Sequence, residues 1–430
     1  MLEPLHVVHQ RLRHHPRAVP WRVRFSMGLG RGARSREITM LAPATAAAPV
    51  LSRVHNGVLL LNPADVAIAA PEHADGLPEA LAALQALHSI PIHLGTRPPF
   101  NPEERPVDLP ATEVPDRPTP VPGTLAVGLD IGGTGLKVCA MRDGRALRHA
   151  QAPTWPEGAR GVASLIERSR ALVLEVAAGE RVGSLGVGFA SPMGIGGQVV
   201  GLSTVMQQRL GGVEALQGFA ERVAEGITDG PIAFFNDLAN LGLSLSGEGR
   251  RRLLRLQIGT SFGGCWIDAD GTVNPAELGR LVVDAAPDAR PHTYLPLRGA
   301  MKSYLSNYGI GLTLNALLDE EVPARDVGFR WATLNRQADP RGPELVDWVV
   351  TLLRGVVAEA VAFLPGLHEV ELGGAMLQDA TGRLIRRALD EPGWPVRVGL
   401  SRNPGYDGAV AAARAPLLDT PLRGVRRLGA

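Results

Sequence analysis

The chain has 430 residues, of which 45% are hydrophobic, and a formal net charge of +1 at pH 7. This length allows two or three domains, and the near-zero charge argues against bulk attraction to nucleic acid or to an acidic membrane surface. No apolar run approaches the roughly 20 residues of a membrane span, and the N-terminus lacks the apolar core of a signal peptide. We therefore expect a cytoplasmic protein without a membrane partner.

The first 123 residues predict a small α/β unit followed by a linker. Residues 1–40 carry eight arginines and four histidines, a composition that predicts disorder or weak order. Residues 99–123 are rich in proline and acidic residues, which predicts a polyproline linker that few contacts should cross. The elements expected between these segments are strands over 57–61, 64–70 and 89–95 and a helix over 78–89.

A glycine-rich turn follows the first predicted strand of the main domain, within GLDIGGTGLKV at residues 128–138. A Walker loop or a dinucleotide-binding fingerprint requires a helix directly after the glycines. Here LKVCAM alternates like a second strand, and an Asp143-Gly144 hairpin turn leads into a third strand, RALRHAQAPT. This order excludes both helix-opening motifs and leaves a hairpin whose backbone N–H groups can face an anion.

The same unit occurs a second time. RLLRLQ predicts a strand, IGTSFGG a glycine turn, CWIDA a strand, and Asp270-Gly271 a hairpin turn. Ile131 and Ile258 lie 127 positions apart, as do Asp143 and Asp270. The matching offsets predict a duplicated domain with two hairpin loops that grip the phosphates of a nucleotide across a cleft, although two common hairpins can also coincide by chance.

In combination and in order, these motifs resemble the ROK family, which comprises sugar kinases and related repressors of the actin/hexokinase-like ATPase superfamily. The resemblance runs from about Thr124 to about Pro416 and includes LGVGFASPMGIGGQVVG, FFNDLANLGL, AELGR, HEVELGGAM and GYDGAVAAA. It implies an α/β fold of two ribonuclease-H-like domains around a cleft. The implied boundaries are an N-terminal α/β extension and linker of unknown function over 1–118, a first domain over 124–238 closed by 405–424, and a second domain over 239–404.

The resemblance also implies a reaction, which is ATP- and Mg²⁺-dependent phosphoryl transfer to a sugar hydroxyl with Asp237 as general base. Asp237 can alternatively cap a helix that starts at Leu238, and Asn236 either binds a sugar hydroxyl or only fixes the turn. Asp130 would lie near the Mg²⁺ of the nucleotide, through water, or serve only its turn. Contacts to the nucleotide are implied for Gly132, Gly133, Thr134, Lys137, Gly259, Thr260, Gly263, Gly264, Gly373 and Gly374, although each glycine can serve only its turn.

The sugar site departs from the family pattern. Glu277 matches a sugar-binding glutamate, but Arg280 stands where the family has a histidine, and Lys302 where it has a glutamate. Neither cation can accept a hydrogen bond from a hydroxyl, so we expect a substrate with a negative charge or at least an extra acceptor, such as a uronic acid or a sugar phosphate. In the alternative, Lys302 points to solvent and Arg280 pairs with Asp284.

Two further features of the sequence argue against a structural zinc site and a nucleic-acid partner. The chain has two cysteines, and none lies where the zinc-binding cysteines of the family fall, so we expect no structural zinc. The first 120 residues show no helix–turn–helix pattern like that of ROK repressors, so we expect no nucleic-acid partner. A non-catalytic sugar- or nucleotide-sensing protein is the rival function, polyphosphate is the alternative donor, and a homodimer is left open.

Overall fold

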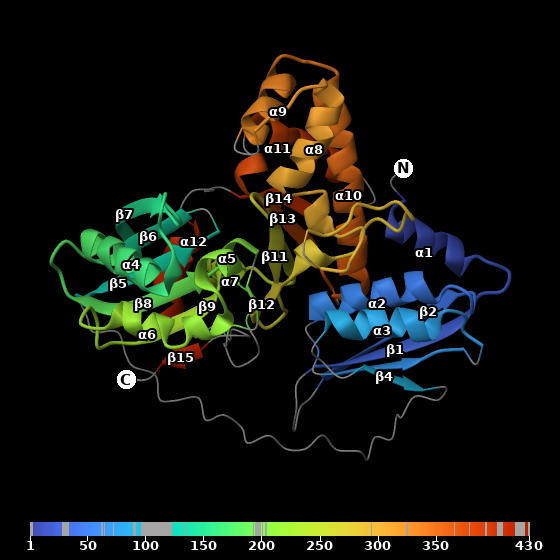
Figure 1. The fold of residues 1–430 in the computed structure, drawn as a ribbon, viewed down its shortest axis with the longest axis horizontal. Coiled ribbons are helices and arrows are strands. Elements are labelled where there is room, and N and C mark those ends of the chain that lie inside the picture. The colour runs from blue at the N-terminus through green and yellow to red at the C-terminus, as the bar shows by residue number, and fades with distance from the viewer. Residues whose placement is uncertain are drawn as a thin grey trace. The chain divides into compact units, whose positions relative to one another are not determined.

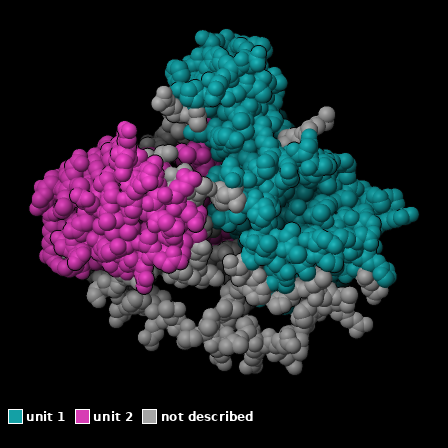
Figure 2. Space-filling model, in the orientation of Figure 1, with its two compact units in different colours: residues 1–113, 276–367, 379–397 teal, residues 114–275, 368–378, 398–430 magenta. Residues whose placement is uncertain are grey.

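The computed structural model describes residues 3–428 with some gaps, and these residues form two compact units (Figure 2). Unit 1 comprises residues 1–113, 276–367 and 379–397, and unit 2 comprises residues 114–275, 368–378 and 398–430. Within the described span, the gaps are 28–33, 62, 64, 72, 89–91, 96–122, 134, 192, 194–198, 200, 203, 294, 324–325, 365, 378, 392–393, 402–406 and 418–425.

The first sheet of unit 2 has six strands in the order β15-β9-β8-β5-β6-β7 (Figure 1). Strands β5, β6 and β7 pair antiparallel, whereas β8 pairs parallel with β5 and β9 parallel with β8. The predicted Asp-Gly hairpin turn is present, since Asp143 and Gly144 both have positive φ, 49° and 75°. The strands are β5 (Leu125–Ile131), β6 (Gly135–Arg142), β7 (Arg145–Pro153), β8 (Val182–Phe189), β9 (Ile232–Asn236) and β15 (Arg426–Leu428).

The second sheet repeats this arrangement in the order β12-β11-β10-β13-β14. Strand β10 pairs antiparallel with β11 and parallel with β13, as β5 does with β6 and β8. The three central strands of the two sheets therefore have the same order and direction, which confirms the predicted duplicated ribonuclease-H-like fold. The strands are β10 (Leu253–Ile258), β11 (Phe262–Ile267), β12 (Val273–Ala276), β13 (Glu369–Gly373) and β14 (Arg397–Leu400).

Helix α12 (Asp407–Arg414) lies directly on the first sheet because both surfaces are built from small residues. A Cβ on Gly128 of β5 would collide with the carbonyl of Ala409, and one on Gly186 of β8 with that of Ala412. Glycine in the strands and alanine in the helix therefore permit the close approach. The other helical elements of unit 2 are α4 (Gly161–Ala177), α5 (Thr204–Leu210), η1 (Val213–Leu216), α6 (Phe219–Ala224), α7 (Asp237–Gly247), η4 (Ala375–Leu377) and η5 (Ala415–Leu417).

The N-terminal part of unit 1 is a four-stranded sheet in the order β2-β1-β3-β4, with helices between its strands. The expected disorder of residues 1–40 is wrong for the part that the structure describes, where Trp21 is fully buried. Two of the expected strands and the helix are present as β3, β4 and α3. The elements are α1 (Leu5–Arg13), β1 (Val19–Met27), β2 (Arg34–Ala42), α2 (Ala47–Leu61), β3 (Asp65–Ala69), α3 (Leu77–Leu87) and β4 (Ile92–Gly95).

The strand expected over 57–61 is the last part of helix α2. A short apolar run does not distinguish a strand from a buried helix, because both are apolar on all sides. Helix α2 is such a helix, with 11 of its 15 residues buried. Gly57 permits this packing, since a Cβ there would collide with the rings of Phe25 and Phe363.

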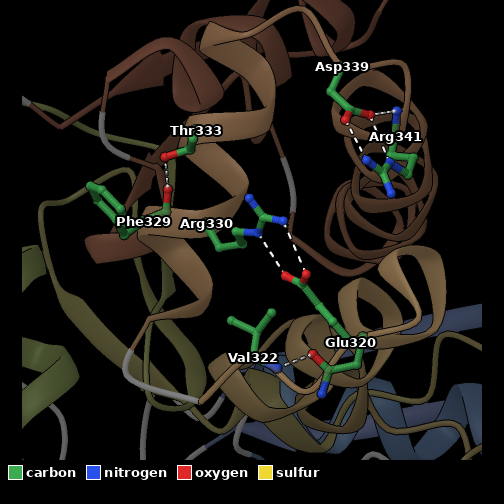
Figure 3. Close-up of polar contacts among 8 residues, drawn as sticks. Glu320, Val322, Phe329, Arg330, Thr333, Asp339 and Arg341 are labelled. Atoms are coloured by element: carbon green, nitrogen blue, oxygen red, sulfur yellow. Dashed lines mark hydrogen bonds and ion pairs between the residues drawn. The ribbon is translucent and has the colours of Figure 1, made fainter.

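The rest of unit 1 is mainly helical. The fork of Arg330 binds the Glu320 carboxylate through two hydrogen bonds of 2.8 and 3.2 Å, and Arg341 binds Asp339 (Figure 3). Because these pairs are partly exposed to water, each contributes little to stability. The elements are η2 (Leu278–Arg280), η3 (Met301–Ser303), α8 (Asn307–Leu318), α9 (Val327–Arg336), α10 (Arg341–Phe363) and α11 (Asp379–Leu389).

The N-terminal part packs firmly on the helical part of unit 1, which corrects the expectation that few contacts cross the linker. Phe25 of β1 and Phe363 of α10 form an edge-to-face pair with ring centroids 5.7 Å apart. The Leu5 amide donates to the Val283 carbonyl at 2.9 Å, and Arg36 donates to the carbonyl of Ala362 at 3.2 Å. Both parts therefore share one core. No helix in the described part of the chain is long and apolar enough to cross a membrane.

Candidate functional site

The start of helix α7 separates the two roles that the sequence left open for Asn236 and Asp237. Asn236 ends β9 and is the N-cap, because its Oδ1 accepts from the Leu238 amide at 2.8 Å. Its Nδ2 donates to the Ser191 carbonyl at 2.8 Å, so the amide is engaged on both sides. Asp237 is the first helical residue and is half-buried, and the capping role expected for it as an alternative belongs to Asn236.

The first glycine turn is closed by its own backbone. The Gly132 amide donates to the Gly135 carbonyl at 2.9 Å, and Thr154 donates from Oγ1 to the Gly132 carbonyl at 2.7 Å. The N–H of Gly132 therefore holds the turn. A Cβ on Gly133 would meet no atom within 4 Å, so this side of the turn has open space. Thr134 lies outside the described residues.

Asp130, at the end of β5, lies against the first turn of helix α12. A Cβ on Gly408 would collide with the Asp130 carboxylate, so this carboxylate packs against the backbone of α12. The positive end of the α12 dipole stabilises a carboxylate in this position. Lys137 of β6 lies directly opposite Asp130 in the ladder, which places both residues on the same face of the sheet.

The second glycine turn is also closed by a backbone hydrogen bond and lies near the start of α7. The Gly259 amide donates to the Ser261 carbonyl at 3.0 Å, and a Cβ on Gly259 would meet no atom within 4 Å. A Cβ on Gly263 would collide with the side chain of Leu238, which follows Asp237. The residue after Asp237 therefore packs against the second strand of this hairpin, within unit 2. Thr260 is exposed, and Gly264 lies in the ladder opposite Leu256.

The two glycines at the end of β13, Gly373 and Gly374, pack closely against other residues of the protein. A Cβ on Gly373 would collide with the guanidinium of the buried Arg255. Gly374 has φ of 110°, and a Cβ there would collide with the Ile258 carbonyl at the end of β10. These contacts explain why both residues are glycines and place the pair next to the second glycine turn. A contact with adenosine stays a prediction.

Three predicted residues of unit 1 lie close together, namely Glu277, Arg280 and Lys302, here called the cationic cluster. Burial raises the pKa of Glu277, whereas Arg280 and then Lys302 lower it. Burial lowers the pKa of Lys302, Glu277 raises it, and Arg280 lowers it. With one carboxylate against two cations, the cluster has an excess of positive charge.

The alternative pairing of Arg280 with Asp284 does not occur. Asp284 is buried, and its Oδ1 accepts from the amides of Glu3 and Ala286 at 2.8 and 3.0 Å. Its Oδ2 accepts from the Tyr304 hydroxyl at 2.6 Å. The Nε of Arg280 is buried and makes no hydrogen bond within the part of the chain that the structure describes.

Sequence reasoning missed two histidines from the N-terminal part, His55 and His88, that lie beside the cationic cluster. His55 is buried on α2, and its Nδ1 lies 2.8 Å from Nε2 of His88. Burial lowers the pKa of His55 to about 4, although its hydrogen bond to the Arg280 backbone raises it. Burial, then His55 and Arg280, lower the pKa of His88 to about 3. His292 adds a third histidine, whose pKa is lowered to about 4 by burial and then by Lys302. The sequence carried no signal for His55 and His88, because no motif includes them.

These buried histidines predict that the free energy of unfolding decreases as the pH is lowered. His9 of α1 is the simplest case, because burial and then Arg53 lower its pKa to about 3. Below about pH 6.5 His9 binds a proton in the unfolded chain but stays neutral in the native chain. The free energy of unfolding therefore falls as pH drops towards 4. We expect His9→Leu to flatten this decline in urea unfolding between pH 7.5 and 5, whereas the exposed His14→Leu should leave it unchanged. An equal decline in all three proteins would contradict the prediction.

Metal ligation receives no support from clustering within the described residues. There, the structure contains no group of three or more His, Cys, Asp or Glu side chains that could hold a metal ion. The expected lack of structural zinc stays a prediction. A single carboxylate such as Asp130 remains suited to a metal that arrives bound to phosphates.

Comparison with known proteins supports the fold. No family model and no curated protein matches the chain. A ROK hexokinase from Thermus thermophilus is 23% identical, with a TM-score of 0.51 over 67% of this chain and 97% of its own. A ROK glucokinase from Streptomyces griseus, solved with glucose and AMPPNP, is 21% identical, with a TM-score of 0.51 over 68% and 98%.

A third solved structure has a different function. It is a ROK family transcriptional regulator, a homologue of the E. coli MLC protein. It is 14% identical to this chain, with a TM-score of 0.50 over 68% of this chain and 78% of its own. Together these likenesses show that the chain has the fold found in ROK proteins. Because kinases and regulators share this fold, the function has to be argued from the site.

Proposed function

We propose that this protein is a ROK sugar kinase that transfers the γ-phosphoryl group of ATP to a hydroxyl of an anionic sugar. The observation that carries the proposal is the start of α7. There Asn236 takes the capping role, and Leu238, the residue after Asp237, packs against Gly263 at the second glycine turn. A carboxylate at this position can accept the proton of an attacking hydroxyl, as phosphoryl transfer requires.

The two glycine turns supply the nucleotide site in this proposal. Each is held by its own backbone hydrogen bond, from Gly132 or from Gly259, and each has open space beside a glycine. A phosphate can approach the backbone closely at Gly133 and Gly259, so these residues fit the group. Bound ATP would supply the phosphoryl group, and its Mg²⁺ would neutralise charge on the phosphates, with Asp130 as the candidate carboxylate beside it.

The cationic cluster supports an anionic acceptor. Arg280 and Lys302 can only donate hydrogen bonds, whereas a neutral sugar needs acceptors for its hydroxyls. Lys302 is half-buried, and the buried Nε of Arg280 makes no hydrogen bond to the described chain. A carboxylate or phosphate on the sugar would accept from the Arg280 Nε, and Glu277 would accept from its hydroxyls.

A non-catalytic sensor on the same fold is the second candidate. The altered sugar site favours it, since two positions differ in charge from the residues that the ROK resemblance leads us to expect. The half-buried Asp237 at the start of α7 favours the enzyme, because a sensor has no need of a general base there. A sensor would bind sugar or nucleotide without releasing ADP.

The test compares D-glucose, D-glucuronate and D-glucose 6-phosphate as acceptors, with ATP–Mg²⁺ and with polyphosphate as donors. A partly desolvated charged hydrogen bond contributes roughly 1.5–3 kcal/mol, so an anionic sugar should exceed glucose in kcat/KM by about tenfold or more. Arg280→Ala and Lys302→Ala should abolish the preference, whereas the exposed Arg336→Ala should not. Efficient glucose phosphorylation that is insensitive to both variants would refute the anionic substrate, and binding without turnover would favour the sensor.

A further inference from the structure

Two side chains of helix α2, in the N-terminal part, hydrogen-bond to the backbone of residues 280 and 282. The Asn56 Nδ2 donates to the Val282 carbonyl at 2.9 Å, and its Oδ1 accepts from the Val282 amide at 2.8 Å. The side chain thus binds one residue in both directions, as a neighbouring strand would. Asn56 is fully buried, so these bonds replace those that it would make to water.

His55 makes a third bond, to the residue that carries one of the two cations. Its Nε2 lies 2.9 Å from the Arg280 carbonyl, which can only accept, so this nitrogen carries the proton. Its Nδ1 is therefore an acceptor in the neutral ring and takes a hydrogen bond from Nε2 of His88. The Arg280 carbonyl thus fixes the tautomer of His55 and, through it, that of His88, and both histidines belong to the N-terminal part.

The backbone of residues 280–282 is also hydrogen-bonded to the segment that contains Lys302. The Met301 amide donates to the Leu281 carbonyl at 2.8 Å, and Val282 forms an antiparallel bridge with Ala300. Residues 280–282 therefore lie between helix α2 on one side and the Lys302 segment on the other. A shift of α2 would move the backbone of both cations.

Helix α2 is itself held rigidly. Asn56 also donates to the buried Glu359 carboxylate of α10 at 3.3 Å, and Arg53 lies 3.4 Å from the same carboxylate. The close packing at Gly57, against the rings of Phe25 and Phe363, leaves no room for sliding. A rigid support of this kind is what a binding residue needs if its position is to be defined.

We propose that α2 is a positioning element of the sugar site, in which His55 and Asn56 fix the backbone of residues 280–282 and so place Arg280 and Lys302. The N-terminal part is then a component of substrate selection rather than an appended module. The role in selection rests on the proposed function, whereas the role in fixing the backbone does not.

The test uses His55→Leu, which removes the donor to the Arg280 carbonyl, and His55→Gln, whose amide nitrogen can restore it. In the full chain, hydrogen exchange of residues 280–282 should become about tenfold faster in His55→Leu, the scale of one lost buried hydrogen bond. His55→Gln should restore the slow exchange. The KM for the preferred sugar of the three-sugar assay should rise by about tenfold in His55→Leu, while the KM for ATP stays within about twofold.

One control variant and one replacement variant keep the outcomes distinct. Arg330→Gln breaks the partly exposed pair with Glu320 in the same unit and should change neither exchange nor KM (Figure 3). If His55→Leu does not fold, His88→Leu takes its place and should give a smaller change in the same direction. Unchanged exchange at 280–282 would overturn the proposal, as would equal rises in both KM values. Faster exchange in a protein that phosphorylates none of the sugars would uphold the positioning of the backbone and refute the kinase.

Discussion

Without residues 3–95, the rest of the chain is expected to lose its cooperative unfolding transition and to precipitate. The reason is the core that the two parts of unit 1 share. Phe363 of α10 is buried against Phe25 and the backbone of Gly57, and all of these contacts come from the N-terminal part. Its loss would expose the apolar side of α10, and large exposed apolar surfaces drive aggregation.

The smaller variant Phe25→Ala should show the same dependence without a deletion. Removing a buried phenylalanine costs about 3–5 kcal/mol, a large share of the stability of a typical domain. The measurement is chemical unfolding of the full chain, with Leu147→Ala on the partly exposed β7 as control.

Co-expression of residues 1–110 with residues 111–430 should restore a soluble complex, because the shared core does not need the covalent connection. A fragment 123–430 that is soluble and monomeric and unfolds in one sharp transition would contradict the prediction. It would show that the N-terminal part is a separate module.

The duplicated fold was predictable because its signals are local. Each glycine turn lies between two short alternating strands, and the Asp-Gly hairpins recur at the same offset. Asp143 and Gly144 adopt the positive φ values that such a hairpin requires. Period and turn chemistry together therefore specified three strands of the first sheet and two of the second without any tertiary information.

The N-terminal part was harder to predict because tertiary contacts decide its structure. Residues 57–61 are apolar on every side since α2 packs between the N-terminal sheet and α10, so the run has no helical period. In residues 1–40, the arginines and histidines suggested disorder, yet Trp21 and Phe25 are buried at alternate positions of β1. Composition over 40 residues masked a strand of nine.

The same distinction applies to the candidate site. Asp237 stood out because it follows an apolar strand and an asparagine, and the structure assigns the capping bond to that asparagine. His55 and Asn56 had no such signal, since their partners Arg280 and Val282 lie more than 220 positions away. A residue that acts on a distant backbone leaves no spacing for sequence reasoning to detect.

Asp237→Asn is expected to lower turnover by about 10²-fold or more, the scale of general acid–base catalysis, while ATP binding is retained. The substitution keeps the size of the side chain and removes its ability to accept a proton. Its structural cost should be small, because an acidic residue in the first turn of a helix contributes about 0.3–1 kcal/mol through the dipole. The capping bond, which the Leu238 amide donates to Asn236, does not involve the side chain of Asp237.

These magnitudes separate catalysis from structure. A 10²-fold loss corresponds to about 2.7 kcal/mol of transition-state stabilisation, more than the expected change in folding stability. Single-turnover phosphorylation of the preferred sugar and equilibrium binding of ATP should therefore respond differently to the variant. Asp229→Asn, an exposed aspartate before β9, provides the matched control and should leave both unchanged. If Asp237→Asn phosphorylates the sugar at the wild-type rate, its carboxylate serves only the helix, and the kinase mechanism loses its base.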